Sequence, residues 1–114
     1  MYRVIVFLAL LLSFNASAEI TNFTGEIRQL VAKDNVLQGE DESFVEMSGF
    51  SSAGSCKNGL YGVRAVIRDS DAGSRQFSLL LSAAVSKSTI RVQVDDTYKN
   101  SGGYCYLRNV RYEF

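Results

Sequence analysis

Histidine, tryptophan and proline are absent from this 114-residue chain, and cysteine occurs only twice. Serine and cysteine nucleophiles rely on a neighbouring base, usually histidine, so the common arrangements are excluded. Two thiolates without histidine do not complete a tetrahedral metal shell. Paired-carboxylate hydrolysis is also disfavoured, because the adjacent Asp95 and Asp96 of an extended strand point to opposite faces. We therefore expect no enzyme activity, no metal centre and no cofactor.

An excess of charge of either sign is also missing, since twelve Lys and Arg residues balance twelve Asp and Glu residues. The basic residues stand singly among acidic ones, whereas nucleic-acid binders cluster them against phosphates. A polybasic patch for anionic membranes is missing for the same reason. We expect neither nucleic acid nor a membrane surface as the partner.

The first apolar run is short. Residues 4–12 are strictly apolar, follow Arg3 and precede Ala16-Ser17-Ala18, a small-x-small sequence typical of leader peptidase sites. A membrane anchor is the alternative, but a bilayer helix needs about 20 apolar residues, and no second run of that length follows. The sequence predicts a leader at residues 1–18, one domain at residues 19–114, no membrane insertion, and a secreted or periplasmic destination.

The two cysteines, Cys56 and Cys105, both follow the predicted leader. Export places them in an oxidising compartment, where thiols pair. A domain of about 96 residues buries only a modest core, so a covalent link is useful to it. We predict an intramolecular disulfide that contributes about 4 kcal/mol by closing a loop of roughly fifty residues.

Alternation of apolar and polar residues predicts five strands. They span residues 24–32, 43–48, 60–68, 89–95 and 104–114, with loops at 33–42, 49–59 and 96–103. The residues expected to point inward from the third and fourth strands are Tyr61, Val63, Ala65, Ile67, Ile90, Val92 and Val94. The last strand changes parity after Leu107, which predicts a β-bulge near Arg108 and Asn109.

Residues 74–87 change to a helical period. Their apolar stripe consists of Phe77, Leu80, Leu81, Ala84 and Val85. Asp69-Ser70-Asp71 supplies an N-cap and acidic side chains ahead of this helix. The alternative for this Asp-x-Asp pair is a calcium loop, but the required glycine and closing glutamate are not at the right spacing.

The order strand, strand, strand, helix, strand, strand predicts a mostly β protein with one helix. A five-stranded OB-fold-like Greek-key barrel has this arrangement. The alternative is an open α+β sheet with the helix on one face, because periodicity gives the order of the elements and not the closure of a barrel.

Aromatic and polar residues gather around the predicted loop at residues 96–103. Tyrosine offers a flat apolar face and a hydroxyl, which suits sugars and protein partners. The alternative is that these tyrosines cover the sheet because of their strand propensity. OB-folds bind oligosaccharides and oligonucleotides beneath the loops after the first and fourth strands. The candidate ligand-binding residues are Asp96, Tyr98, Asn100, Tyr104 and Arg108. Alanine at Tyr98 or Asn100 is expected to change the stability by less than about 0.5 kcal/mol.

Residues 77–95 combine a short helix ending in small residues, a turn and an alternating strand. Together with residues 25–30 and the late cysteine strand, this pattern resembles small exported proteins similar to the B subunit of subtilase cytotoxin. The resemblance implies an OB-fold, a ring-shaped homopentamer, and glycan recognition on behalf of a separate catalytic subunit. It transfers no sugar-binding residue to this chain.

Two functional hypotheses follow. The first is a secreted or periplasmic non-catalytic binding module, glycan-binding and pentamer-forming as in toxin B subunits. The alternative is a monomeric periplasmic inhibitor or envelope accessory protein that binds another protein. The oligomeric state and a neighbouring enzyme gene with its own leader separate these hypotheses.

Overall fold

The computed structural model of the chain describes residues 18–34 and 42–113. Seven strands form one mixed sheet, and the described residues contain one helix, α2 (Asp71–Ser86). The strands are β1 (Ile20–Gly25), β2 (Ile27–Val31), β3 (Phe44–Met47), β4 (Asn58–Gly59), β5 (Gly62–Val66), β6 (Ile90–Lys99) and β7 (Cys105–Arg111). The predicted mostly β chain with one helix is confirmed. The predicted leader lies outside the described residues except for Ala18, as does most of the predicted loop at 33–42.

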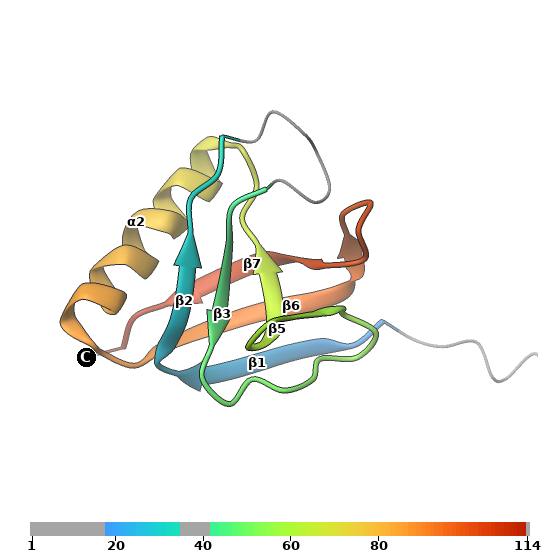
Figure 1. Cartoon of the computed structure of the whole chain (residues 1–114), viewed down its shortest axis with the longest axis horizontal. Helices are drawn as coiled ribbons and strands as arrows, with labels where there is room; N and C mark the ends of the chain where they lie inside the picture. Colours follow the sequence, from blue (N-terminus) through green and yellow to red (C-terminus); the bar gives the residue numbers. More distant parts are fainter. Residues whose placement is uncertain (1–17, 35–41, 114) are drawn as a thin grey trace, which may run out of the picture.

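The sheet follows a path whose two ends are neighbours along the chain. Adjacent strands on this path are β1, β6, β7, β5, β3 and β2, and β4 pairs with β5 beside it. The described pairs are antiparallel except β5 with β7, which run parallel through Val66 and Tyr106. Only Glu26 separates β1 from β2. The sheet therefore bends round an interior, and α2 lies beside β2 (Figure 1).

The prediction of one strand at residues 24–32 is wrong, because the chain forms two strands there. β1 begins earlier, at Ile20, and pairs with β6, whereas β2 pairs with β3. The bend follows Gly25, where an added Cβ would lie 2.8 Å from the Phe23 ring. At Glu26 the carbonyl accepts the N–H of Ser48, which directs the chain toward β3.

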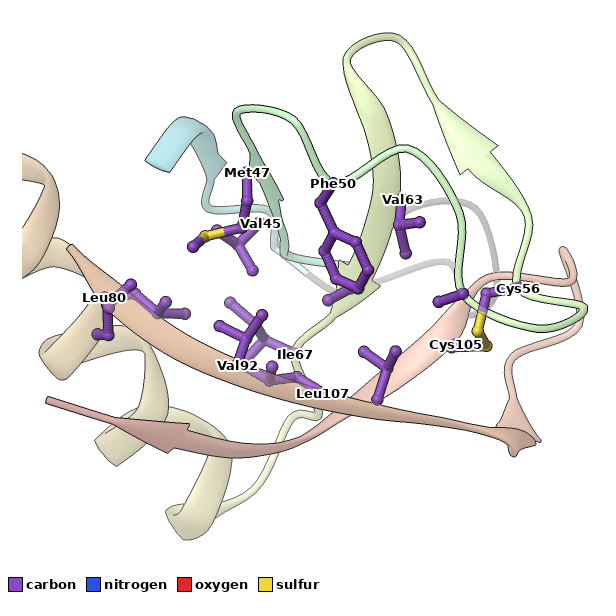
Figure 2. Packing of buried hydrophobic residues seen from close by; sticks show 14 of the residues in the cluster. Val45, Met47, Phe50, Cys56, Val63, Ile67, Leu80, Val92, Cys105 and Leu107 are labelled. Atoms are coloured by element: carbon purple, nitrogen blue, oxygen red, sulfur yellow. A yellow bond between two sulfur atoms is a disulfide. The ribbon is translucent and has the colours of Figure 1, made fainter. Parts of the chain in front are cut away.

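The hydrophobic core fills the inside of this sheet. Side chains from β3, β5, β6 and β7 converge there with Leu80 of α2 (Figure 2). The predicted inward positions are buried at Val63, Ala65, Ile67, Ile90, Val92 and Val94. Tyr61 is the exception and is 41% exposed, because it lies in the tight turn between β4 and β5. Its predicted inward position is therefore wrong.

Helix α2 begins at Asp71, three residues before the predicted start at 74. The predicted cap is confirmed: Ser70 is the N-cap, and its Oγ accepts the N–H of Gly73 at 3.0 Å. Leu80 is fully buried as predicted, but Leu81 and Val85 are exposed, so the predicted stripe is wrong there.

Small residues explain the rotated stripe. Gly73 and Ala83 share the buried face with Leu80. A Cβ on Gly73 would overlap the carbonyl oxygen of Arg68. The first turn of the helix therefore packs closely against the segment that follows β5, and Leu81 lies outside the buried face.

The predicted loop at residues 96–103 is wrong over its first half, since β6 continues to Lys99. The Asp96 N–H donates to the Glu19 carbonyl, which extends the pairing of β6 with the start of the domain. The predicted bulge is confirmed. Asn109 pairs with Gln93 and Leu107 with Val94, which leaves Arg108 as the additional residue of β7.

The predicted disulfide is also confirmed, with the Cα atoms of Cys56 and Cys105 5.3 Å apart. It attaches the loop between β3 and β4 to the start of β7. Disulfides of this kind are typical of proteins in oxidising compartments outside the cytosol. Within residues 18–34 and 42–113, no helix has the length and apolar character that crossing a bilayer requires.

Candidate functional site

The five candidate residues lie in four different surroundings. The carboxylate of Asp96 is held by hydrogen bonds within the protein. Its Oδ1 accepts the N–H of Glu19 at 2.8 Å, and its Oδ2 accepts the N–H and the hydroxyl of Ser55 at 3.0 and 3.3 Å. The amides of Glu19 and Ser55 hold the pKa of this carboxyl below its ordinary value. Asp96 therefore joins the start of the domain to the loop that carries Cys56.

Asn100 shapes the turn between β6 and β7 and is only 9% exposed. Its Oδ1 accepts the N–H groups of Gly102 and Tyr104, both at 3.1 Å. Its Nδ2 donates to Glu42 Oε1 at 3.4 Å. Because these bonds hold a buried amide, the expectation that Asn100→Ala is neutral for stability is not supported by the geometry.

Tyr104 lies on the side of β3, β5 and β7 that faces away from the core, here called the outer face. The outer face consists of Phe44, Glu46, Arg64, Val66, Tyr104 and Tyr106. The Arg64 guanidinium lies 3.8 Å from the Phe44 ring centroid and 4.9 Å from that of Tyr104. The Nζ of Lys57 lies 5.0 Å from the centroid of the same Tyr104 ring. Tyr104 is therefore part of a packed layer of cations and rings.

A fully buried carboxylate lies beneath this layer. Glu46 Oε2 accepts the N–H of Tyr61 at 3.0 Å, and Oε1 lies 3.6 Å from Arg64 Nη2. Gly59 covers the pair, since a Cβ there would lie 2.5 Å from Glu46 Oε2. Buried charge of this kind requires a partner, and Arg64 supplies it. The outer face is therefore closed by the β4–β5 hairpin.

Tyr98 and Arg108 line a hollow of about 290 Å³ beside the start of α2, here called the helix hollow. Its lining residues are Arg68, Ser70, Ala72, Gly73, Gln76, Tyr98, Leu107 and Arg108. The Arg108 guanidinium lies 5.5 Å from the ring centroid of Tyr98, which is 47% exposed. Arg108 also pairs with the buried Asp95 carboxylate at 3.4 Å. The sequence-predicted pair is thus brought together in one concave place.

The bulge of β7 and the first turns of α2 build this hollow together. Because Arg108 is the additional residue of β7, its backbone carbonyl is available to another element. Gln76 of α2 donates to that carbonyl at 3.2 Å. The hydrogen bond ties the helix to the bulge and keeps the amide of Gln76 at the wall of the hollow.

A second hollow of about 320 Å³ lies next to the helix hollow, and Arg68 and Gly73 line both. The second hollow has an apolar contribution from Ile67 and Phe77. The Arg68 guanidinium lies 4.3 Å from the Tyr106 ring centroid. Burial raises the pKa of the Tyr106 hydroxyl, and the neighbouring Glu42 carboxylate adds to this effect. Tyr106 therefore stays a neutral donor over the physiological pH range.

The helix hollow offers guanidinium and amide donors together with one accessible aromatic face. These groups suit a ligand with hydroxyl or carboxyl oxygens and an apolar face. Among residues 18–34 and 42–113, no group of three or more acidic or cysteine side chains is placed to hold a metal ion.

Sequence reasoning missed Arg68 and Gln76 as members of the site. Arg68 had a signal, since it shares the outward parity of its strand with Arg64. Gln76 had none, because its position depends on the bulge of β7 and on the rotation of α2.

The comparisons with known proteins add no relative to this description. No protein-family model, no curated protein and no solved structure matches the chain.

Proposed function

We propose that this chain is an exported, non-catalytic binding module with an OB-fold barrel, and that it binds glycans in the helix hollow. The observation that carries the proposal is the hollow itself. Two arginines, Arg68 and Arg108, line it, and each guanidinium lies over a tyrosine ring. Stacking on a ring restricts a guanidinium while leaving its in-plane N–H donors directed at a ligand.

The path of the sheet supports the OB-fold. β1 and β2 act as one bent first strand, whose halves pair with β6 and β3 at the two ends of the path. Such a connection closes a barrel, and α2 follows the third main strand as in OB-folds. The resemblance of residues 77–95 to the subtilase cytotoxin B-subunit family supports the same fold and a glycan ligand.

The outward side of α2 supports assembly of several copies. Leu81 and Val85 are one helical turn apart, and their exposed fractions are 48% and 78%. Exposed aliphatic neighbours of this kind are candidates for burial between subunits. We therefore extend the proposal to a homo-oligomer that serves a separate catalytic subunit. The family resemblance implies a pentamer. Light scattering on the mature protein tests it, and a monomer at micromolar concentration contradicts it.

A second candidate function rests on the β4–β5 hairpin. Leu60 at its tip is 75% exposed, and the neighbouring Tyr61 ring lies 4.5 Å from the Arg28 guanidinium carbon. Aromatic residues and arginine are enriched in protein interfaces. This tip favours a monomeric periplasmic inhibitor or envelope accessory protein that contacts another protein.

A glycan array with the wild-type protein and two variants tests the proposed function. Tyr98→Ala removes the aromatic face of the helix hollow, and we expect loss of the wild-type signal with unchanged melting. Tyr61→Ala is the matched control, because it also removes an exposed tyrosine beside an arginine. It should bind as the wild type does.

Two results would count against the helix hollow. If Tyr98→Ala binds as well as wild type, the glycan site lies elsewhere. If the wild-type protein binds no glycan, the protein-partner candidate gains. In that case, Leu60→Ser should release a copurifying partner, and Tyr98→Ala should retain it.

A further inference from the structure

We propose that removal of the leader creates an ion pair between the new α-ammonium group of Glu19 and the Asp96 carboxylate, which fastens the mature N-terminus to the loop carrying Cys56. This inference rests on the proposed export and processing, and not on the glycan ligand. Its basis is the 2.8 Å hydrogen bond from Glu19 N to Asp96 Oδ1. The predicted peptidase site ends at the residue immediately before this nitrogen.

Cleavage changes the chemistry of that nitrogen without requiring it to move. The leader peptidase adds one water across the Ala18–Glu19 peptide bond. The hydroxyl goes to the Ala18 carbonyl carbon, the C–N bond breaks, and the protons end on the Glu19 nitrogen. The products near neutral pH are an Ala18 carboxylate, which leaves with the leader, and a Glu19 α-ammonium. A neutral donor is thereby replaced by a cation, which strengthens its hydrogen bond to a carboxylate.

The carboxylate is already oriented for this partner. Its Oδ2 is held by the N–H and the hydroxyl of Ser55, so that Oδ1 remains directed at Glu19. Gly54 makes room for the carboxylate, since a Cβ there would overlap it, and its φ of +50° favours glycine. The next residue after Ser55 is the half-cystine Cys56. The ion pair therefore joins the N-terminus, β6 and the disulfide-linked loop at one point.

Lys99 is a charged neighbour of the pair and has two opposite effects on it. Lys99 on β6 donates to Ser55 Oγ and helps to hold the pKa of Asp96 low. Its ammonium repels a second cation, so it opposes the proposed pair. The loop at residues 53–56 contributes no ionisable side chain, because Cys56 is oxidised. The carboxylate of Glu19 itself is exposed and well solvated.

The pair predicts an amine that is harder to deprotonate than an ordinary N-terminus. The ordinary α-amino pKa is about 7.7–8.0. A neighbouring carboxylate raises it, so the stabilisation is fully present below that value and is lost as the pH rises through the folded-state pKa. Removing the carboxylate leaves only the repulsion by Lys99. Asp96→Asn should therefore bring the amine pKa down to the ordinary range or below it.

The experiment uses the exported, purified protein. Intact-mass analysis first identifies the N-terminal residue, and acetylation of its amine is then followed across a pH series by peptide mass spectrometry. Only the neutral amine reacts, so the midpoint reports its pKa. We expect a terminus at Glu19 and a midpoint above about pH 8 in the wild type. The midpoint should be lower in Asp96→Asn and unchanged in Asp69→Asn, which removes an exposed carboxylate elsewhere.

Two outcomes overturn the proposal, and they have different consequences. A terminus other than Glu19 refutes both the processing site and the ion pair. A Glu19 terminus with equal midpoints in wild type and Asp96→Asn refutes the ion pair alone. As a second readout, acetylation of the amine should lower the melting temperature of the wild type and leave that of Asp96→Asn unchanged. Equal losses in the two proteins would also refute the pair.

Discussion

Two regions of the molecule carry the same classes of residue, yet the fold uses them differently. One is the helix hollow, and the other is the end of β6 with the turn toward β7, here called the turn side. On the turn side, the side-chain oxygen atoms of Asp96 and Asn100 accept hydrogen bonds from backbone amides. In the helix hollow, Tyr98 keeps an accessible ring, and Arg108 pairs with the Asp95 carboxylate while 43% of its side chain stays exposed. The type of a residue is therefore a poor guide to whether its side chain is available to a ligand. Its remaining hydrogen-bonding capacity and its exposure determine that availability.

The largest loss of stability should come from a substitution in α2, the helix that borders the helix hollow. Leu80 is fully buried and holds α2 against the sheet. Leu80→Ala should lower the free energy of unfolding by about 2–5 kcal/mol, because it leaves a cavity. Arg75→Ala is the control and should stay within about 0.5 kcal/mol, since that side chain of α2 is exposed and lies outside the proposed subunit contact. Urea denaturation measures both, and equal losses would mean that the helix face is wrongly assigned.

The turn side is weakened by reduction of the disulfide. The bond closes a segment with a sequence separation of 49 residues. Its loss should cost about 4 kcal/mol in the chain-entropy description of the unfolded state. Calorimetry with and without a phosphine reductant measures the change. A melting temperature that does not fall on complete reduction would contradict this description.

These two predictions were only partly accessible from the sequence. The cysteine pairing, the burial of Leu80 and the inward faces of β5 and β6 follow from composition and periodicity. The exposure of Leu81 does not, because the buried face of the helix is made by the small residues Gly73 and Ala83 together with Leu80, and small residues add little to an apolar pattern. The bend at Glu26 was likewise hidden, since the polar residues of β1 mask its alternation.

A substitution at Asn100 tests whether this one side chain stabilises the turn side. Asn100→Ala leaves the amides of Gly102 and Tyr104 without their acceptor, which should cost about 1–3 kcal/mol. Asn109→Ala, on the exposed face of β7, should cost less than about 0.5 kcal/mol. Denaturant titration of both variants is the measurement. A neutral Asn100→Ala would return Asn100 to the candidate ligand residues.

The pH dependence of stability tests the role of Asp96. Because its folded-state pKa is lowered, its stabilising contribution is present above the unfolded value of about 3.9 and is lost as the pH falls through the folded value. Asp96→Asn should therefore show a smaller loss of melting temperature between neutral pH and pH 3 than the wild type. Equal losses of melting temperature in the two proteins would contradict this role of Asp96.

The candidate site could be predicted from the sequence only as a neighbourhood. Tyr98 and Arg108 were named from the chemistry of their side chains, and they do line one hollow. Asp96, Asn100 and Tyr104 were named by the same reasoning and belong to other contacts. What separates the two groups is the extension of β6 to Lys99 and the bulge at Arg108, which set where each side chain points.

The most direct test of the central claim is an NMR titration of the labelled mature protein with the strongest glycan from the array. The stability of the protein should not change in Tyr98→Ala by more than about 0.5 kcal/mol, so loss of binding there reports the site. In the wild type, the Arg108 side-chain Nε–H and the Gln76 side-chain amide should shift most. Largest shifts at Arg28 and in the backbone of Leu60 and Tyr61, with none in the helix hollow, would contradict the account.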